Sequence, residues 1–143
     1  MMKALTIWQP WAGMVAAGIK RNETRSWGTN YRGQIAIHAA KQDIHIGWCR
    51  YLSDEAAEVI CRRLDLPEVF NAVKAFPTGC VLATANLVEC IKITPEFIAT
   101  LSLDELALGD YTLGRYAWKM ADVKQLSDPI PARGRQGLWE WEG

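Results

Sequence analysis

The sequence predicts an α+β fold, in which a small curved sheet or β-barrel carries flanking and inserted helices. About six segments either alternate between apolar and polar residues or are continuously apolar, as short strands are. Helix signals lie between these segments, above all in residues 43–74. The chain has 143 residues, half of them hydrophobic, which suits one packed domain. We therefore expect a single domain over residues 1–143.

Residues 1–40 are expected to form strands around one helix. Pro10 can occupy the first helical position, and Gly18 suits the residue just past the helix end. Residues 11–17 between them are apolar on every side, which predicts a helix wedged against other elements. The expected strands in this part are residues 3–8, 20–27 and 34–40.

The rest of the chain is expected to hold more strands and several helices. Residues 43–74 read as a mostly acidic helical stretch, with Ser53 as an N-cap and Pro67 as a break. Short helices should start at Thr94 and at Ser102, the latter with Glu105 at capping-box spacing. The other expected features are strands over 79–92 (buried on both faces), 115–120 and 138–142, an extended stretch at 129–131 and a basic turn at 133–136.

Composition excludes several classes of protein. No apolar run reaches the roughly 20 residues of a membrane helix, so we expect no membrane association. The opening MMKALTIWQP lacks signal-peptide features, so we expect a cytoplasmic protein with reduced cysteines. No CxxC pair or glycine-rich nucleotide motif occurs, and His45 has no ligand at suitable spacing. We therefore expect neither a metal nor a cofactor.

Charge is distributed unevenly, although the net charge is zero. Residues 1–50 carry seven Lys or Arg and two Asp or Glu, whereas residues 51–110 carry four and ten. This pattern favours a local basic site and an acidic face over indiscriminate binding to nucleic acid. The densest early cluster is GIKRNETRSW, residues 18–27, between two apolar stretches.

Four ordered blocks of the sequence resemble the ASCH domain family (activating signal cointegrator homology). The first is IWQPWAGMVAAGIKRNETRSW followed by YRGQIAIHAAK, with a Gln-Pro-Trp helix start and the pattern Gly-x-Lys-x-x-Glu-x-Arg. In this chain the pattern is Gly18, Lys20, Glu23 and Arg25. The other blocks are GCVLATANLVEC, GRYAWKM and PIPARGRQGLWEW, so the resemblance covers nearly the whole chain.

The resemblance implies a PUA-like fold, a small β-barrel with a cleft at which the Lys-x-x-Glu-x-Arg residues gather. Relatives with this fold mostly bind RNA or modified nucleobases, and some ASCH proteins have been proposed to be ribonucleases. One small bacterial enzyme of the wider group deacetylates N4-acetylcytidine with a lysine, a threonine three residues later and a distant glutamate. Lys20 matches that lysine, and Glu23 stands in place of the threonine. The candidates for the distant glutamate are Glu89, Glu96 and Glu105.

The cluster at residues 20–25 raises a question of geometry. A flat strand places Lys20 and Glu23 on opposite faces, so we expect a β-bulge to bring both to one side. A lysine and a carboxylate facing one cleft could recognise a base edge or a phosphate, and in an enzyme they are the catalytic candidates. Arg25 could orient Glu23. The alternative is a solvated strand with cross-strand ion pairs.

Aromatic residues near the cluster are candidates for stacking on a base. Trp8 and Trp11 could form a wall of the cleft that includes Pro10, with Gln9 reading a base edge through its amide. The alternative for this segment is core packing and a helix start. Tyr31 is a candidate second stacking surface. Trp27 is another, although we favour a place in the core for it.

Basic and titratable residues elsewhere extend the candidate binding surface. Arg133 and Arg135 could contact phosphates, with Gly134 allowing a close backbone approach, or they could be solvated turn residues. Lys41 could extend the same surface. His38 could line the cleft as a titrating group or be a hydrogen-bonded structural residue.

These observations support three hypotheses about function. The first is a binding module that takes single-stranded RNA or a modified nucleobase or nucleoside in a basic, Trp-walled cleft. The second is a metal-independent hydrolase, a ribonuclease or an N4-acetylcytidine-type amidohydrolase, that uses the same cleft. The third is a protein-interaction module that uses the acidic helical segment 51–110.

Overall fold

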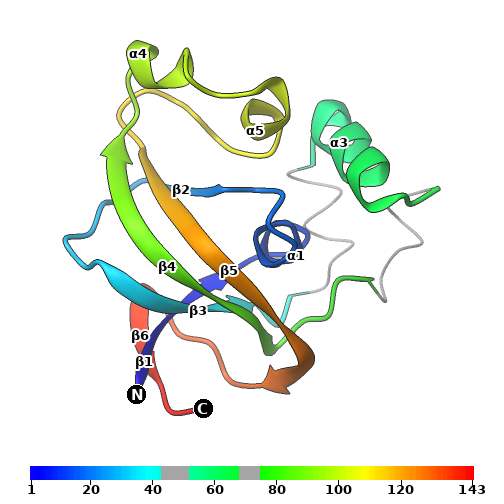
Figure 1. Cartoon of the computed structure of the whole chain (residues 1–143), viewed down its shortest axis with the longest axis vertical. Helices are drawn as coiled ribbons and strands as arrows, with labels where there is room; N and C mark the ends of the chain where they lie inside the picture. The colour runs from blue at the N-terminus through cyan, green and yellow to red at the C-terminus, as the bar shows by residue number, and fades with distance from the viewer. Residues whose placement is uncertain (43–51, 68–74) are drawn as a thin grey trace.

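The computed structural model describes residues 1–42, 52–67 and 75–143. In these residues six strands form one sheet in the order β2-β5-β4-β3-β1-β6 (Figure 1). The strands are β1 (Met2–Ile7), β2 (Asn22–Arg25), β3 (Gly33–Ala39), β4 (Cys80–Lys92), β5 (Tyr116–Pro131) and β6 (Leu138–Trp141). The helices are α1 (Trp11–Ala16), α3 (Asp54–Leu64), α4 (Pro95–Ile98) and α5 (Leu103–Ala107). β1 and β3 are parallel and the other pairs antiparallel, so the α+β prediction is confirmed.

The sheet is curved but open, so the predicted closed barrel does not form. Closure would require the two edge strands, β2 and β6, to pair with each other, but β6 pairs with β1 along Met2–Leu5. In the described part of the chain, β2 pairs with β5 alone. The sheet nevertheless curls far enough for the Arg25 guanidinium of β2 to donate to the Thr6 carbonyl of β1 at 2.6 Å. A side chain therefore bridges the seam between β1 and β2.

Three of the four helices in the described residues begin at caps that the sequence predicts. The hydroxyls of Ser53, Thr94 and Ser102 each accept the backbone N–H three residues later, at 3.0–3.2 Å. These bonds satisfy N–H groups that have no partner within the helix. The rest of the long helical stretch predicted around α3, residues 43–51 and 68–74, lies outside the described residues.

The first helix begins one residue later than predicted. Pro10 is its N-cap and Trp11 its first helical residue, because the buried side chain of Gln9 supplies the cap. The Gln9 Oε1 atom accepts the backbone N–H of Gly13 at 2.7 Å. This bond replaces the side-chain cap that a proline cannot provide.

The main core lies between α1 and the sheet, as the all-round apolar character of that helix predicts. Ile35, Ile37 and Ala39 of β3 share the face that joins it. The opposite face of β3 is also covered, since Ala36 packs in a second cluster with the tryptophans of β6. β4 is buried over its first four residues but exposed at Val88 and Glu89. The prediction of a strand buried on both faces is therefore wrong for its second half.

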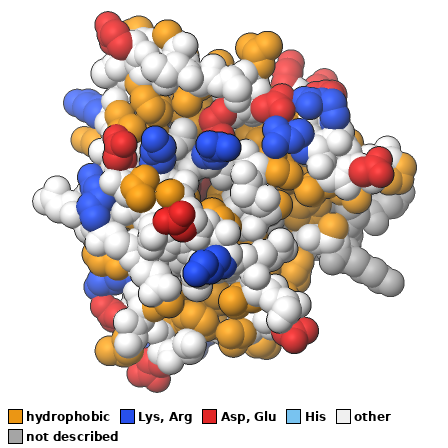
Figure 2. Space-filling model, viewed as in Figure 1, with side chains coloured by type: hydrophobic (Ala, Val, Ile, Leu, Met, Phe, Trp, Pro, Cys, Tyr) orange, Lys and Arg blue, Asp and Glu red, His pale blue; other side chains and the backbone are white. Residues whose placement is uncertain are grey.

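Charges are mixed on the face of the molecule shown in Figure 2, where Lys and Arg lie among Asp and Glu side chains. The acidic segment is partly neutralised by its own arginines. Arg62 and Arg63 of α3 both bind Asp104 of α5, at 2.7 and 2.9 Å. Among the described helices, none has the length and apolar character to cross a membrane.

Candidate functional site

A cavity of about 770 Å³ opens at the seam between β1 and β2. It is lined by the end of β1, the Trp8–Trp11 region, Lys20, most of β2, and residues 107–110 after α5. Its volume lies within the range of about 300–1,000 Å³ that is usual for small-molecule sites. We call this cavity the Lys20 cleft.

Lys20 reaches the cleft because α1 ends just before it. Gly18 adopts a φ of +75°, which favours glycine and reverses the chain at the helix end. The N–H groups of Ile19 and Lys20 then both donate to the carbonyl of Met14, at 3.1 and 3.0 Å. This turn buries the Lys20 side chain to 2% exposure at the wall of the cleft.

Lys20 and Glu23 meet in the cleft, but no β-bulge brings them together. Lys20 precedes β2, and the register of β2 against β5 is regular from Asn22 to Arg25. The Lys20 ammonium donates to the Asn22 carbonyl at 2.5 Å and to Glu23 Oε1 at 3.1 Å. The predicted bulge is therefore wrong, because the strand begins two residues later than expected and strand alternation does not apply to Lys20.

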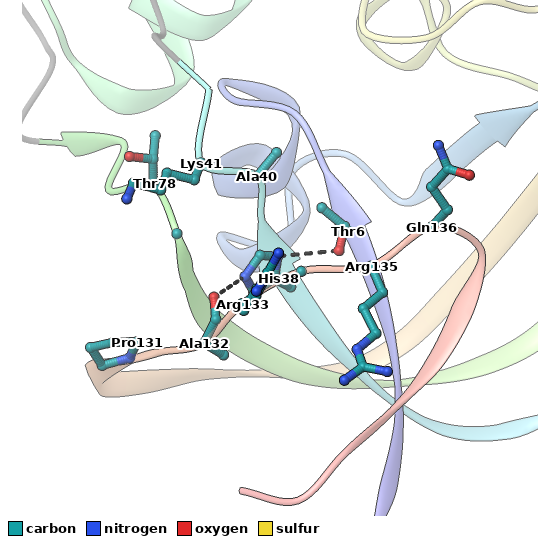
Figure 3. Close-up of a pocket in the computed structure, with 12 residues that line it drawn as sticks. Thr6, His38, Ala40, Lys41, Thr78, Pro131, Ala132, Arg133, Arg135 and Gln136 are labelled. Carbon is teal, nitrogen blue, oxygen red and sulfur yellow. Dashed lines mark hydrogen bonds between the residues drawn. The ribbon is translucent and has the colours of Figure 1, made fainter.

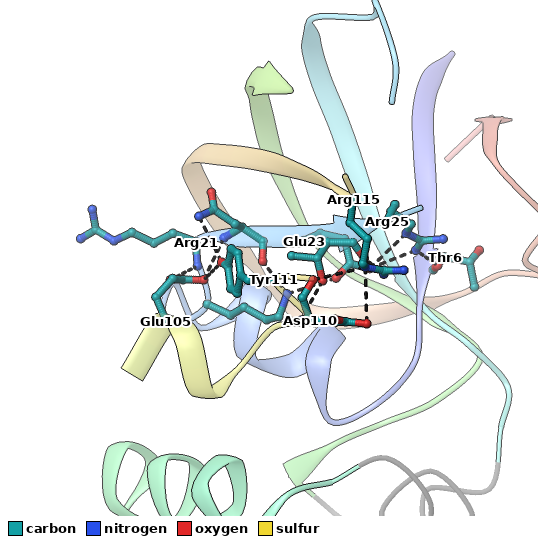
Figure 4. A network of polar contacts seen from close by, with 11 residues as sticks. Thr6, Arg21, Glu23, Arg25, Glu105, Asp110, Tyr111 and Arg115 are labelled. Atoms are coloured by element: carbon teal, nitrogen blue, oxygen red, sulfur yellow. Dashed lines mark hydrogen bonds and ion pairs between the residues drawn. The ribbon is translucent and has the colours of Figure 1, made fainter. Parts of the chain in front are cut away.

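Glu23 joins two cations into a chain of alternating charges. It is 8% exposed, and its second oxygen accepts from Arg25 Nε at 3.2 Å. Arg25 continues to the Thr6 carbonyl, as Figure 4 shows. The solvated-strand alternative is wrong for Lys20 and Glu23, which are buried. In the described part of the chain, the Lys20 ammonium has two acceptors for its three protons, so one N–H remains for a ligand.

A second ion pair at the cleft was not foreseen from the sequence. Arg115 Nε lies 3.4 Å from Asp110 Oδ2, and its Nη2 donates to the Thr24 carbonyl. The hydroxyl and backbone N–H of Thr112, with the charge of Arg115, hold the pKa of Asp110 below its ordinary value. The only sequence signal was that Arg115 is the second residue of the GRYAWKM block. Of the described residues, three cations and two carboxylates line the cleft, which gives them one positive charge in excess.

Glu105 anchors the segment that carries Lys20. Its carboxylate, 7% exposed, accepts the backbone N–H groups of Arg21 and Asn22 at 2.9 and 3.2 Å, and the Tyr111 hydroxyl at 3.1 Å. The predicted capping box is therefore only half formed, since Ser102 caps α5 but Glu105 binds another segment. Burial and the Glu105 carboxylate raise the pKa of Tyr111. Of the three candidate glutamates, Glu105 alone contacts the cluster at residues 20–25 in the described structure.

The two tryptophans predicted to form a wall both line the cleft. Trp8 is 41% exposed and Trp11 is half-buried against the core. Gln9 does not line it. Its amide is bound to Gly13 and, through Nε2, to the Pro77 carbonyl at 2.7 Å. Pro10 is buried, so the tryptophans face the cleft while the residues between them form the helix start.

Tyr31 and Trp27 do not line the cleft. The Tyr31 hydroxyl donates to the Gln34 carbonyl at 2.6 Å, which holds it beside β3. Trp27 packs edge-on against Trp118, with ring centroids 4.8 Å apart, and remains 36% exposed. The core position predicted for Trp27 is therefore only partly reached.

The remaining predicted binding residues line a second cavity of about 880 Å³ on the other side of Thr6 (Figure 3). They are His38, Lys41, Arg133 and Arg135. His38 is 1% exposed and hydrogen-bonded on both ring nitrogens, to Thr6 Oγ1 and to the Ala132 carbonyl. His38 is therefore a hydrogen-bonded structural residue, which is one of the two roles considered for it from the sequence. We call this cavity the basic cavity.

No group of three or more His, Cys, Asp or Glu side chains is placed to hold a metal ion in the described ranges. His45 and Cys49 lie outside those ranges.

The family model of the ASCH domain matches residues 5–130 of the chain. The chain belongs to the ASCH domain family. A stretch of 88 residues is 32% identical to Activating signal cointegrator 1 of Homo sapiens and 33% identical to its counterpart in Mus musculus. The matched stretch is 61% of this ASCH chain but 14% of each relative. An open, curved sheet with flanking helices is consistent with the PUA-like fold expected of an ASCH domain.

Proposed function

We propose that this ASCH domain is a cytoplasmic binding module that takes a base of single-stranded RNA, or a modified nucleobase or nucleoside, in the Lys20 cleft. One observation carries the proposal. The cleft combines an exposed tryptophan with a buried chain of hydrogen-bonding charges, in a volume usual for small-molecule sites. We do not extend the functions of the larger relatives to it, because the match covers a small part of them.

The two kinds of lining suit the two parts of a nucleobase. A base has an apolar face, which stacks on an aromatic ring such as Trp8. It also has a polar edge with donors and acceptors, which require complementary groups. Lys20 and Arg25 supply donors and Glu23 supplies acceptor oxygens. Because Lys20 and Glu23 are buried, their bonds to a ligand face little competition from water.

The hydrogen bonds of Lys20 favour recognition over base catalysis. The lysine forms an ion pair with the Glu23 carboxylate, and an ion-paired ammonium has three N–H donors and no lone pair. A general base must instead present a lone pair to its substrate. Deprotonation of Lys20 would also remove a counter-charge from a buried carboxylate.

A metal-independent hydrolase remains the second candidate, because Glu23 is a buried carboxylate that lines the cleft. A carboxylate in this position could hold or activate a water molecule. The hydroxyl of the N4-acetylcytidine enzymes is replaced by Glu23, and Glu105 is committed to backbone N–H groups. Both features favour a ribonuclease over that amidohydrolase within this second candidate.

A binding and turnover experiment distinguishes these functions. The chain is incubated without added metal with short single-stranded RNAs, DNAs, nucleosides and acylated cytidines. Binding is followed by calorimetry and products by chromatography. We expect saturable binding without products, weakened by Trp8→Ala and by Lys20→Met. Products that disappear in Glu23→Gln while binding persists would make the chain a hydrolase. Absence of both binding and products would refute the proposal and favour a protein partner for the acidic segment 51–110.

A further inference from the structure

The structure also indicates what kind of molecule carries the base. We infer that the ligand is a phosphodiester strand rather than a free base or nucleoside, with its backbone phosphates held in the basic cavity beside the Lys20 cleft. This inference rests on the proposed function of the cleft. It would exclude a free nucleobase and a free nucleoside as the ligand and leave a nucleic-acid strand.

The two cavities are adjacent, and Thr6 lies between them. Thr6 lines both cavities. Its carbonyl accepts from Arg25 on the side of the Lys20 cleft, and its hydroxyl bonds to His38 on the side of the basic cavity. β6 pairs with β1 only as far as Leu5, so between the cavities the Arg25 side chain and the segment around Gly134, rather than a β-strand, lie against the end of β1. A strand whose base enters the cleft therefore has a short path for its backbone across Thr6.

The basic cavity has the charge that a polyanion requires. Among the described residues, its charged lining residues are Lys41, Arg133 and Arg135, and none of its lining residues is a carboxylate. All three are exposed. The described structure gives none of their side chains a hydrogen bond or ion pair. By contrast, Lys20, Arg25 and Arg115 of the Lys20 cleft are all bound to carboxylates. Phosphate can therefore engage the cations of the basic cavity without breaking an existing ion pair.

The two arginines lie on a segment that the protein holds in place. The Ala132 carbonyl can only accept, so the His38 ring donates to it from Nε2, at 2.7 Å. Nδ1 then accepts from the Thr6 hydroxyl at 3.2 Å, and that hydroxyl accepts from Trp139 Nε1 at 3.0 Å. Each group in this chain has one consistent role when the His38 ring carries a proton on Nε2. The chain ties residue 132, and so the segment that follows it, to β1 and β3.

Gly134 brings the same segment into direct contact with β1 and β3. A Cβ atom at this position would lie 2.7 Å from the His38 ring and 2.8 Å from Thr6 Oγ1. The predicted close backbone approach therefore exists, but toward His38 and Thr6. Any side chain here would push the segment away from them. A cavity whose cations are positioned before binding loses less conformational entropy when a ligand arrives.

The test compares ligands that share a base but differ in phosphates. A nucleoside, its monophosphate, a dinucleoside monophosphate and a short oligoribonucleotide are titrated by calorimetry into the wild-type chain and Arg133→Gln/Arg135→Gln. The control is Lys92→Gln/Lys124→Gln, since both lysines are exposed, have no ion pair in the described structure and line neither cavity. Circular dichroism checks that all variants are folded.

We expect affinity to rise from nucleoside to oligonucleotide in the wild type. The arginine variant should lose on the order of tenfold in oligonucleotide affinity at about 0.1 M salt, and its log–log salt slope should shrink by about 1.4, or 0.7 for each lost phosphate contact on a single strand. Its nucleoside affinity should equal that of the wild type. The lysine variant should change the oligonucleotide affinity and the salt slope by less than the arginine variant does.

The outcomes separate this inference from the proposed function. If no ligand binds, or if Trp8→Ala binds every ligand as the wild type does, the Lys20 cleft is not the base site and both fail. If Trp8→Ala weakens binding but the arginine variant keeps the wild-type affinity and salt slope, the cleft stands and the phosphate inference is overturned. Equal affinity of the wild type for nucleoside and oligonucleotide would overturn it as well.

Discussion

Lys20 is the residue around which the candidate site is organised. Burying an ammonium is costly unless its charge is neutralised and its protons are hydrogen-bonded. Here Glu23 neutralises the charge and accepts one proton, and the Asn22 carbonyl accepts a second. Glu23 is in turn shared with Arg25. Apolar residues of similar volume could fill this space with less electrostatic cost. The position of these buried charges at the wall of a cavity therefore favours a role in binding over a role in stability.

Removing the Lys20 charge should destabilise the fold. Lys20→Met leaves Glu23 buried with only Arg25 as a counter-charge, and breaking such a pair costs about 3 kcal/mol of unfolding free energy. Urea denaturation measures the change. Lys119→Met is the control, because Lys119 is half-exposed and lies 3.9 Å from Glu89. A loss below about 1 kcal/mol for Lys20→Met would contradict the description of a buried, coupled pair.

Trp8 should contribute to binding far more than to stability. Stacking on one base is worth about 1–3 kcal/mol, so Trp8→Ala should weaken RNA binding by about ten- to a hundredfold. Trp27→Ala is the matched control, since Trp27 is similarly exposed but lines neither cavity. Fluorescence anisotropy of labelled single-stranded RNA measures both. Equal losses in the two variants would show that Trp8 is not a specific stacking surface.

At the scale of elements, α5 and β2 are joined by a buried polar network. Glu105 of α5 binds two N–H groups at the start of β2, and the Tyr111 hydroxyl donates to Glu105 and accepts from the side-chain amide of Asn22. Through these bonds, α5 sets the position of the segment that carries Lys20 and Glu23. The network is thus a support for the Lys20 cleft, although it does not contact a ligand.

Glu105→Gln should weaken this support. The glutamine keeps one acceptor oxygen but presents an NH₂ group to a backbone N–H, so we expect a loss of about 2 kcal/mol in unfolding free energy. RNA affinity should also fall, because Lys20 and Glu23 are positioned less firmly. Glu96→Gln on the exposed face of α4 should change neither quantity. Chemical denaturation measures the unfolding free energy of both variants, and titration with RNA measures their affinity. If Glu105→Gln and Glu96→Gln give the same values, Glu105 does not support the Lys20 cleft.

The same network predicts a dependence of stability on alkaline pH. Burial and Glu105 raise the pKa of Tyr111 above its ordinary value of 10.0 in the folded state. The unfolded chain therefore loses this proton first, so the contribution of Tyr111 is complete below pH 10.0 and declines as the pH rises further. Tyr111→Phe cannot ionise and should lose less stability over this range. The unfolding free energy of both proteins is measured by urea denaturation at a series of pH values above 10.0. If it falls equally in the wild type and in Tyr111→Phe, the raised pKa of Tyr111 is contradicted.

The ends of helices could be predicted from the sequence where hydrogen bonds between neighbouring residues determine them. The caps at Ser53, Thr94 and Ser102 depend on a side chain and an N–H three residues away, and all three form. Predictions failed where a distant partner decides the outcome. Glu105 binds the start of β2, across more than eighty residues, in place of its own helix N-terminus. Lys20 lies outside β2, which no alternation pattern could show.

At the scale of the whole molecule, the Lys20 cleft exists because the sheet does not close. β2 and β6 are the two edges of the sheet, β6 covers β1 only as far as Leu5, and the seam between β1 and β2 is crossed by Arg25. Sequence patterns and the family resemblance identified Trp8, Trp11, Lys20 and Glu23 as cleft residues. They could not identify Thr6, Asp110 or Arg115, because those residues reach the cleft only through the curvature of the sheet and the path after α5.

The most direct test of the central claim maps where a base is held. Short single-stranded RNA containing a photoreactive thio-substituted base is cross-linked to the full chain, and the modified residues are identified by mass spectrometry. The account predicts cross-links at Trp8 or Trp11, reduced by competing unlabelled RNA and by Arg25→Gln. Cross-links confined to α3 and α5, or a yield that unlabelled RNA does not reduce, would contradict it.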